Sequence, residues 1–303
     1  MALATSQSAP TLRCDVADGI GNKKRFAVSV AATRGPRGTM EDRYFVSEDL
    51  TFFAVYDGHG GYRVADLALN YLYAFFVKAA KPKPSEALLE AFTQVSEAVL
   101  SDARLDLEGS TACVVHVGEK YYTSANVGDS RAILCRGSDA INLTHDHKPD
   151  APSERARVEK LGGMVKWHGY LGPDRLPVQG MGAYRINGNL AVSRALGDKL
   201  ERPFVSSQPD IAETERHEDD KFILVASDGL WDVISSQEAC DFVKQIMAGS
   251  MRGGSRVPGT SKEKGLIRAI IETRREKMSH YLVEEALRRG SSDNVTALVV
   301  WLR

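Results

Sequence analysis

The chain has little of what secreted, zinc-binding or membrane proteins require. Its 303 residues include four cysteines, at positions 14, 113, 135 and 240, and no two are spaced as C-x-x-C. So few cysteines predict a reducing compartment without a disulfide framework or a zinc motif. The first residues lack a signal-peptide pattern, and no apolar run approaches the roughly 18 residues that span a membrane. We therefore expect an intracellular protein, in the cytoplasm or also the nucleus, with no membrane partner.

An excess of charge is missing as well. Lys and Arg together number 39 and Asp and Glu number 40, so the formal net charge is −1. This balance argues against a nucleic-acid partner bound on a broad basic face, but not against a small anion held by one or two arginines. Hydrophobic residues make up 43% of the chain, as in ordinary soluble globular proteins, and we expect a monomer.

Several catalytic motifs are also absent. There is no Gly-Lys dipeptide, which excludes a Walker A loop, and no His-Arg-Asp or Asp-Phe-Gly triplet of protein kinases. No cysteine is followed six positions later by arginine, and neither H-E-x-x-H nor G-x-S-x-G occurs. The sequence thus offers no recognisable cysteine or serine nucleophile for phosphate or acyl transfer.

What the chain does contain is a series of short β-rich runs. Phe52–Tyr56, Phe222–Ala226 and Val295–Leu302 are almost continuously apolar, which is typical of strands buried on both faces. Residues 111–117 and 121–127 read as a hairpin, and 190–193 as a further strand. Helical patterns cover 64–76, 85–99, 153–161, 236–247 and 262–289, with Ser85 as a candidate N-cap.

Strands that are buried on both faces need a covering layer on each side. With roughly ten strands, two packed sheets clad by helices fit best, so we predict an α+β fold: a four-layer α-β-β-α sandwich of mainly antiparallel sheets. Residues 1–20 are predicted to be a mobile tail, although Leu12 to Val16 could add an edge strand. Residues 21–303 then form one catalytic domain, in which 166–184 are inserted and 249–261 form a flexible Gly/Ser-rich loop.

Aspartates recur where apolar strands meet Gly- or Ser-bearing loops. Asp57 and Asp228 follow such runs and Asp293 precedes one, while Asp129 follows the hairpin strand. A single Asp-Gly after a strand is more often only a turn, but four such sites are harder to dismiss. Clustered carboxylates would repel and raise each other's pKa, and a divalent cation resolves that conflict. A set of hard oxygen ligands favours Mg²⁺ or Mn²⁺ and phosphoryl chemistry.

Two further residues could complete such a site. Arg37 could bind phosphate oxygens with its guanidinium, or it could be an ordinary exposed loop arginine. His59, in Asp57-Gly58-His59-Gly60-Gly61, titrates near neutral pH and could protonate a leaving alkoxide, although a lone His is more often a polar surface residue.

These residues belong to eight segments that together resemble a known family, the metal-dependent protein serine/threonine phosphatases of type 2C. The segments stand in family order and, with their flanking strands, span about residues 25 to 302. They are Arg37–Asp42, Tyr56–Gly61, Gly109–Thr111, Asn126–Arg131, Asp146–Pro149, Leu190–Asp198, Ser227–Asp232 and Ser292–Asn294. The resemblance implies hydrolysis of phosphoserine and phosphothreonine in phosphorylated protein substrates.

The resemblance also implies a set of metal ligands. Asp57 would bridge two Mg²⁺ or Mn²⁺ ions, Asp228 and Asp293 would complete one of them, and the carbonyl of Gly58 would contribute to the other. Glu41 and Asp42 would lie nearby, contacting the ions through bound waters.

The remaining roles follow in the same way. Arg37 would grip the phosphate and His59 would act as the acid, while Asp129 and Asp232, with Asp228, would form a weaker third metal position. Water between the two main ions would attack phosphorus directly, so no phosphoenzyme would form.

The chain departs from the family pattern at the insertion. The family runs quickly from Gly162-Gly163 into a strand, whereas this chain adds residues 166–184 in a region that is a flap beside the family's active site. Candidate substrate-contacting residues there are Trp167, His168, Tyr170, Asp174 and Arg175. The alternative is a surface loop packed on its own aromatics.

Two other functions remain compatible with the same residues. One is a catalytically silent binding or regulatory module on this fold, which would usually have lost a metal aspartate or the arginine. The other is a small-molecule phosphate hydrolase, which the metal residues alone do not exclude.

Overall fold

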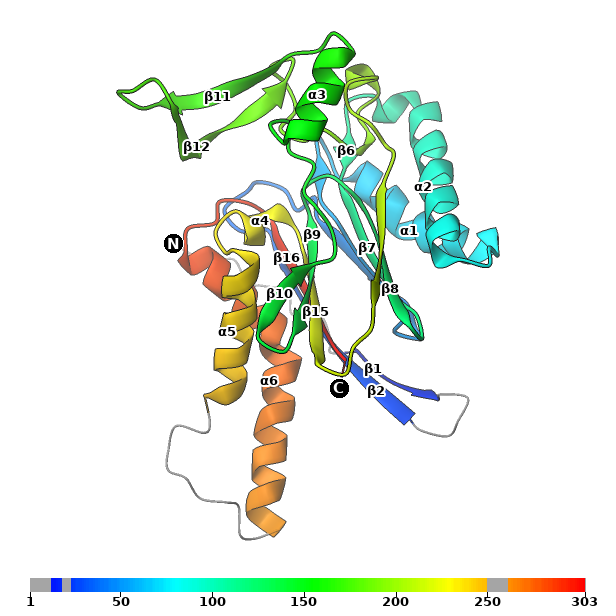
Figure 1. Ribbon diagram of the computed structural model, residues 1–303, viewed down its shortest axis with the longest axis vertical. Helices are drawn as coiled ribbons and strands as arrows, with labels where there is room; N and C mark the ends of the chain where they lie inside the picture. Colours follow the sequence, from blue (N-terminus) through cyan, green and yellow to red (C-terminus); the bar gives the residue numbers. More distant parts are fainter. Residues whose placement is uncertain (1–11, 18–22, 250–260, 303) are drawn as a thin grey trace.

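The computed structural model describes residues 12–17, 23–249 and 261–302, and its centre consists of two antiparallel sheets (Figure 1). One sheet has six strands in the order β1-β2-β16-β15-β9-β10 and the other has five in the order β14-β8-β7-β4-β3. The strands of the first are Leu12–Ala17, Lys23–Thr33, Val295–Trp301, Asp220–Ala226, Arg131–Arg136 and Asp139–Asn142. Those of the second are Asp210–Glu215, Tyr121–Val127, Ala112–Val117, Phe52–Tyr56 and Arg43–Val46.

The apolar runs are explained by burial on both faces of each sheet. Phe53 and Val55 of β4 belong to the core between the sheets, together with Ile223 and Leu298 of β15 and β16. The alternate residues of β4, such as Phe52, pack instead under the helices α1 and α2. Because side chains alternate across a strand, only a continuous apolar run can satisfy both layers.

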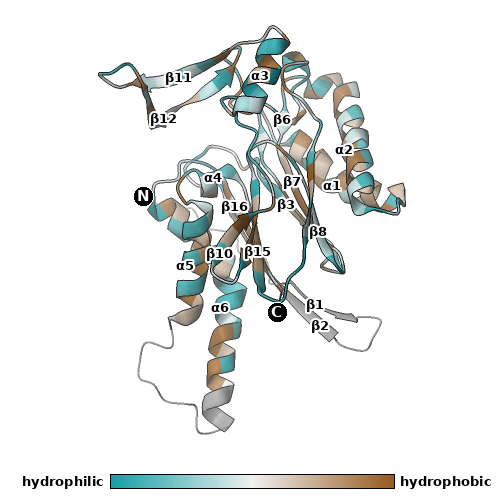
Figure 2. Ribbon diagram, viewed as in Figure 1, coloured by the Kyte–Doolittle hydropathy of each residue, from teal (hydrophilic) through white to brown (hydrophobic). Residues whose placement is uncertain are grey.

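The helices complete the four predicted layers. α1 and α2 cover the five-stranded sheet, while α4, α5 and α6 cover the six-stranded one. Hydrophobic colouring is concentrated in the central strands and in the helix faces that meet them (Figure 2). The helices are Arg63–Ala79, Pro84–Ser101, Pro152–Lys160, Asp228–Trp231, Ser236–Ala248 and Ser261–Arg288, with short 3-10 turns η1 at Ala103–Leu105 and η2 at Lys199–Glu201.

Two local predictions were wrong. The N-cap of α2 is Lys83, with Pro84 at the first helical position, so Ser85 lies inside the helix; the fixed φ of proline suits that first position. Residues 190–193 form no strand and make only an isolated bridge between Leu190 and Ile186. This apolar stretch packs in a small separate core under α3 rather than in a sheet.

The structure also bears on the predictions for the N-terminal tail, the loop at 249–261 and the insertion. Part of the predicted tail forms β1, which pairs with β2 as the edge strand that Leu12 to Val16 suggested. Of the predicted loop at 249–261, residues 250–260 lie outside the described part of the chain. The inserted segment forms a hairpin of β11 (Val165–Leu171) and β12 (Pro177–Ile186). No helix among the described residues is long and apolar enough to cross a membrane.

Candidate functional site

Asp57, Asp228 and Asp293 converge at one end of the two sheets. Asp57 directly follows β4, Asp228 begins α4 just after β15, and Asp293 lies just before β16. The charges of the other two aspartates, and those of Asp42 and Asp129, raise the pKa of Asp57. Strand ends from both sheets therefore bring carboxylates from distant parts of the chain into one cluster.

Backbone and side-chain hydrogen bonds fix the loops that carry these groups. The Asp57 amide donates to Thr111 Oγ1 at 3.0 Å, and the Thr111 amide donates to the Asp57 carbonyl at 2.8 Å. Asn294 Nδ2 donates to the carbonyls of Arg34 and Thr39, both at 2.9 Å, and thereby ties the loop before β3 to the start of β16. The predicted Arg37–Asp42 and Ser292–Asn294 segments thus form one unit.

Asp42, the last residue of the first of these segments, is almost completely buried. Its Oδ2 accepts hydrogen bonds from Ser227 Oγ at 2.8 Å and Thr296 Oγ1 at 2.7 Å. Its Oδ1 is buried and has no hydrogen-bond partner among the described residues. Burial raises the pKa of Asp42 to about 6, although the two hydroxyl donors oppose that rise.

The pKa values of Asp57 and Asp228 are also raised. Burial is the largest cause for Asp57, and the charges of Asp42 and Asp228 add to it. For Asp228 burial is again the main cause, followed by the charge of Asp129, while Lys148 opposes the rise. Ionising these carboxyls together is costly unless a cation joins them.

Two basic side chains already contact the outer carboxylates of the cluster. Arg37 Nη2 donates to Asp293 Oδ2 at 2.6 Å, and the Arg37 side chain is 57% exposed. Lys148 Nζ donates to Asp129 Oδ2, and its distance to Asp232 Oδ1 is 4.0 Å. Burial alone would lower the pKa of Lys148, but Asp129 and Asp228 raise it, so this side chain is a permanent cation.

The donor set suits a hard divalent cation. Buried carboxyls with raised pKa values and an orphaned Asp42 Oδ1 offer oxygen ligands without a neutralising partner. Among the described residues, however, no group of three His, Cys, Asp or Glu side chains is arranged to hold an ion as it stands. Asp293 and Asp129 are instead held by Arg37 and Lys148, and would have to exchange these partners for a metal.

Glu41 and Gly58 are neighbours, joined by a backbone hydrogen bond next to the acidic cluster. Glu41 Oε1 accepts a hydrogen bond from Thr39 Oγ1 at 2.7 Å, and the Glu41 carbonyl accepts one from the Gly58 amide at 3.3 Å. A Cβ at Gly58 would lie only 2.8 Å from the Glu41 carbonyl oxygen and 2.9 Å from that of Gly61. The close approach of these backbones therefore requires glycine at position 58.

His59 contacts Asp198, a carboxylate to which the sequence motifs gave no role. Its Nε2 lies 2.8 Å from Asp198 Oδ2 and 2.9 Å from Oδ1, and Asp198 is buried. Burial would lower the pKa of His59, but the hydrogen bond and charge of Asp198 outweigh it, so the pKa is raised. A Cβ at Gly109 would collide with both members of the pair, which explains the glycine there.

A cavity of about 620 Å³ opens beside the cluster. It extends from Asp232 and Asp293 to the underside of the β11–β12 hairpin, and residues 148–150 form another wall. Of the five flap residues predicted to contact substrate, Trp167 lines this cavity. His168, Tyr170, Asp174 and Arg175 are exposed and are not among its lining residues. Asp174 instead accepts the Leu176 amide at 3.0 Å within the hairpin turn.

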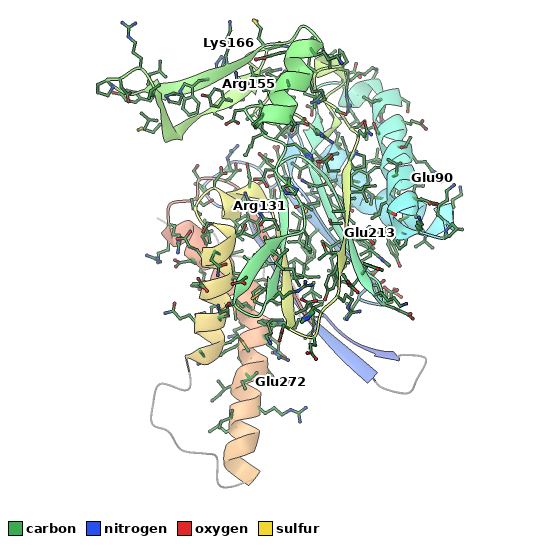
Figure 3. The ribbon with its side chains drawn as sticks, in the orientation of Figure 1. Glu90, Arg131, Arg155, Lys166, Glu213 and Glu272 are labelled. Carbon is green, nitrogen blue, oxygen red and sulfur yellow. The ribbon has the colours of Figure 1, made fainter. Side chains whose placement is uncertain are left out.

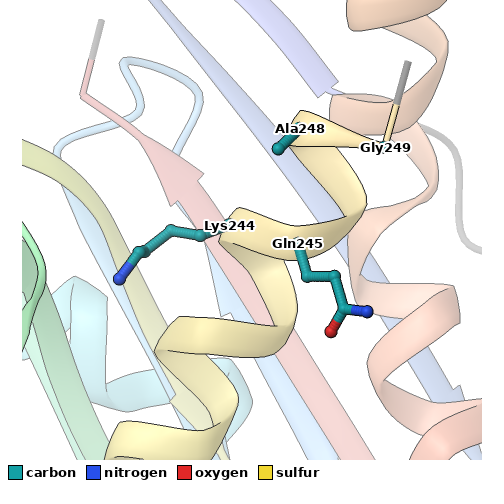
Figure 4. A pocket seen from close by; sticks show the side chains of 4 residues that line it. All are labelled: Lys244, Gln245, Ala248 and Gly249. Atoms are coloured by element: carbon teal, nitrogen blue, oxygen red, sulfur yellow. The ribbon is translucent and has the colours of Figure 1, made fainter. Parts of the chain in front are cut away.

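A second hollow, of about 510 Å³, lies at the end of α5 (Figure 4). It is lined by Lys244, Gln245, Ala248 and Gly249. Among its described lining residues Lys244 is the charged one, and none of the strand-end aspartates reaches it. It offers no arrangement comparable with the acidic cluster.

Sequence reasoning missed two partners, Asp198 and Lys148. Both lie inside segments that had been matched, Leu190–Asp198 and Asp146–Pro149, but neither stands at the end of an apolar strand. Asp198 has a left-handed φ of 51°, which is uncommon for a residue other than glycine. That strained backbone marks a constrained position, yet it is invisible in the sequence.

Comparison with known proteins agrees with the fold and the motifs. A family model described as "Protein phosphatase 2C" matches residues 26–295. A rice protein, "Probable protein phosphatase 2C 59", is 34% identical over 293 residues, which cover 93% of this chain and 77% of the relative. Another rice protein, "Probable protein phosphatase 2C 45", is 36% identical over 292 residues, covering 93% and 89%.

Solved structures support the same architecture. A serine-threonine phosphatase 2C from Toxoplasma gondii superposes with a TM-score of 0.65 at 22% identity, covering 96% of this chain and 99% of that one. A C. elegans sex determining protein gives a TM-score of 0.74 at 24% identity, covering 91% and 64%. At these identities the superpositions establish the sandwich fold alone.

Proposed function

Because the chain belongs to the protein phosphatase 2C family, we propose that it hydrolyses phosphoserine and phosphothreonine in proteins with bound Mg²⁺ or Mn²⁺. The observation that carries this proposal is the cluster of Asp57, Asp228 and Asp293 at the ends of strands from both sheets. Family members are metal-dependent protein phosphatases, and this chain keeps the acidic groups that such chemistry needs.

The residues that would hold the ions are the strand-end carboxylates. Asp57, with its central position, would serve two ions, Asp228 and Asp293 one of them, and the Gly58 carbonyl the other. Glu41 and Asp42 would contribute through waters, and a weaker third ion would take Asp129 and Asp232 with Asp228. Bound divalent ions would supply an acidified water as nucleophile and neutralise charge on the phosphoryl group.

Arg37 would then bind the phosphate. Its guanidinium contacts Asp293 and the Ser292 carbonyl, the latter at 3.3 Å from Nε. If a cation engaged Asp293, the exposed Arg37 side chain would be free to bind two phosphate oxygens, which a planar guanidinium holds bidentately.

His59 would deliver the proton to the leaving oxygen. The contact with Asp198 fixes the orientation of Nε2 and raises the pKa of His59. A larger fraction of this imidazole is therefore protonated at neutral pH than of a free imidazole. Asp198 orients the ring, and the other ring nitrogen or a water would face the substrate.

Two alternatives are less favoured by particular observations. A catalytically silent module would usually lack a ligand, whereas Asp57, Asp228, Asp293 and Arg37 are all present. A hydrolase of small phosphate esters would not need a cavity that continues from the cluster to a 22-residue hairpin segment, 165–186.

The direct test is phosphate release from a phosphothreonine peptide. Mn²⁺ or Mg²⁺ should support turnover and EDTA should abolish it. Asp57→Asn should lower kcat/KM by about 1,000-fold, equivalent to ~4 kcal/mol of transition-state stabilisation, because it removes the charge shared by two ions. Asp139→Asn, an exposed acid on β10, is the matched control and should keep full activity. Turnover in EDTA, or an active Asp57→Asn enzyme, would refute the two-ion account.

A further inference from the structure

The cavity beside the acidic cluster is lined by two chemically different kinds of group. The charged ones include Lys148, Asp232 and Asp293 of the candidate metal and phosphate site. The apolar ones are Trp167, Pro177 and Tyr184 of the hairpin and Pro149, Trp231 and Val233 on the core side. The same hollow therefore connects the place where a phosphoryl group would react with a wall of aromatic and aliphatic carbon.

The hairpin side of this wall is held in place by its own packing. Trp167 pairs across the strands with Tyr184, and the rings meet edge to face with centroids 5.3 Å apart. Trp167 Nε1 donates to the Tyr170 carbonyl at 3.2 Å. The guanidinium of Arg155 on α3 lies 5.2 Å from the Tyr184 ring centroid; Arg155 is labelled in Figure 3, as is Lys166 at the start of β11.

The core side of the wall is equally fixed. Trp231 is 7% exposed, and its Nε1 donates to the Ala226 carbonyl at 2.9 Å. Arg131, also labelled in Figure 3, lies 5.1 Å from the Trp231 ring centroid and is itself bound to Asp146. Because both indole N–H groups are already hydrogen-bonded, the tryptophans have ring carbon, and no free donor, to offer an occupant.

Glycines keep the space between the two sides open. Gly180, Gly182, Gly229 and Gly290 all line the cavity and contribute no side chain to fill it. A Cβ at Gly229 would collide with the Asn294 carbonyl, and one at Gly182 with the His168 carbonyl. Close backbone packing therefore requires glycine at positions 229 and 182, both of which line the cavity.

We propose that this aromatic wall is a subsite for an apolar side chain, such as leucine or phenylalanine, that flanks the phosphorylated residue of a protein substrate. The inference rests on the proposed function and specifies which substrates the site would take. An extended peptide advances about 3.3 Å per residue. With its phosphate near Asp293, the residues a few positions from the phosphorylated residue would lie along the cavity.

Charge does not favour a basic or acidic occupant of the cavity beside this wall. Among the lining residues, Lys148 and Asp150 have opposite signs, while Asp232 and Asp293 are candidate ligands whose charge bound metal would neutralise. Arg155 and Arg131 are already engaged with Tyr184 and with Asp146 and Trp231. Burying apolar surface against the rings is therefore the main gain available there.

The test is a panel of phosphothreonine peptides in an alanine background. Each position from three before to three after the phosphothreonine is replaced in turn by Leu, Phe, Lys or Glu, and kcat/KM is measured with Mn²⁺. We expect Leu or Phe to raise kcat/KM about 10-fold over Ala at one position or two adjacent ones, as for a side chain entering a hydrophobic pocket. Trp167→Ala should reduce that ratio to about 2-fold, whereas Trp167→Phe should keep most of it.

Met181→Ala is the matched control, because Met181 is 58% exposed on β12 but does not line the cavity. It should leave the peptide preference unchanged. An equal kcat/KM for every peptide, a preference for Lys or Glu, or an apolar preference that survives Trp167→Ala would overturn the subsite. Failure of the proposed function would look different: the wild-type protein would release no phosphate with Mn²⁺ from any peptide or from an aryl phosphate.

Discussion

The acidic cluster adjoins strands in the middle of the two large sheets, whereas the β11–β12 hairpin is a separate sheet at the periphery. Asp57, Asp228 and Asp293 adjoin β4, β15 and β16, and each of these strands is hydrogen-bonded to a neighbour on both sides. The hairpin strands form a separate two-stranded sheet, and most residues between 166 and 182 are exposed. Figure 1 shows the hairpin projecting away from the sandwich beside α3.

This contrast suggests that reaction chemistry and substrate choice are encoded in separate parts of the molecule. A strand in the middle of a sheet holds its terminal carboxylate rigidly, as a reacting centre requires. A peripheral hairpin can change sequence without disturbing the sheets, as expected of a recognition element. Changes in the cluster should then affect every substrate alike, and changes in the hairpin should affect only substrates long enough to reach it.

Replacing Arg37 should produce the largest effect of the three changes considered next. Arg37→Ala should lower kcat/KM about 100-fold for both a phosphopeptide and an aryl phosphate, because both present the same phosphoryl oxygens. Arg34→Ala is the control, since Arg34 is an exposed arginine of the same loop whose guanidinium donates to the Gly38 carbonyl. Equal activities of the two variants, or a loss confined to the peptide, would mean that Arg37 does not bind the phosphoryl group.

Asp42 should contribute less to the stability of the metal-free protein as pH rises from about 4 to 6. Asp42 has a pKa of about 6 when folded and about 3.9 when unfolded, so its carboxyl binds more protons in the native state in that window. Its contribution to the free energy of unfolding should therefore drop by about 2 kcal/mol between those pH values, measured by urea unfolding of the wild type and Asp42→Asn in EDTA.

Two comparisons isolate the contribution of Asp42. Asp42→Asn should flatten the pH profile, while Asp49→Asn should not, because hydroxyl and backbone donors lower the pKa of Asp49 against the effect of its partial burial. Mn²⁺ should restore stability at neutral pH by favouring the ionised carboxyls. Parallel profiles of the wild type and Asp42→Asn in EDTA would show that Asp42 does not titrate with a raised pKa in the native state.

Replacing the hairpin should have the smallest and most selective effect. Exchanging residues 166–184 for a short Gly/Ser linker should change kcat/KM about 10-fold for phosphopeptides, because a side-chain pocket of this kind contributes about that factor. The effect on an aryl phosphate, assayed in parallel, should be smaller. Equal changes for both substrates would contradict the separation of chemistry from substrate choice.

The cluster was predictable because its signal is local in the sequence. Asp57 and Asp228 each follow a run whose apolar residues alone predict a strand buried on both faces, and both strands form where expected. The layered fold followed from the same runs, and β4 has the predicted ends. The capping box at Ser235 and Glu238 likewise shows how α5 can begin at Ser236, as the pattern indicated.

Other features depend on contacts between distant segments. Asp198 meets His59 across 139 positions of sequence, and Lys148 meets Asp129 because the loop after β10 returns over the end of β8. The strand predicted at 190–193 failed because its apolar residues are used in the small core under α3. Local hydrophobicity does not distinguish an apolar segment buried in a sheet from one buried as a loop in a small core.

The sequence by itself determined the sandwich, the strand-end aspartates and the family resemblance, because burial on two faces and a carboxylate at a strand end both leave short-range patterns. Only the tertiary structure decided which basic side chains contact Asp129 and Asp293, and that Asp198 contacts His59. It also decided that an inserted segment folds as a hairpin over a cavity that both Trp167 and Trp231 line. These outcomes depend on the relative placement of elements, which is set by packing across the whole domain rather than by neighbouring residues.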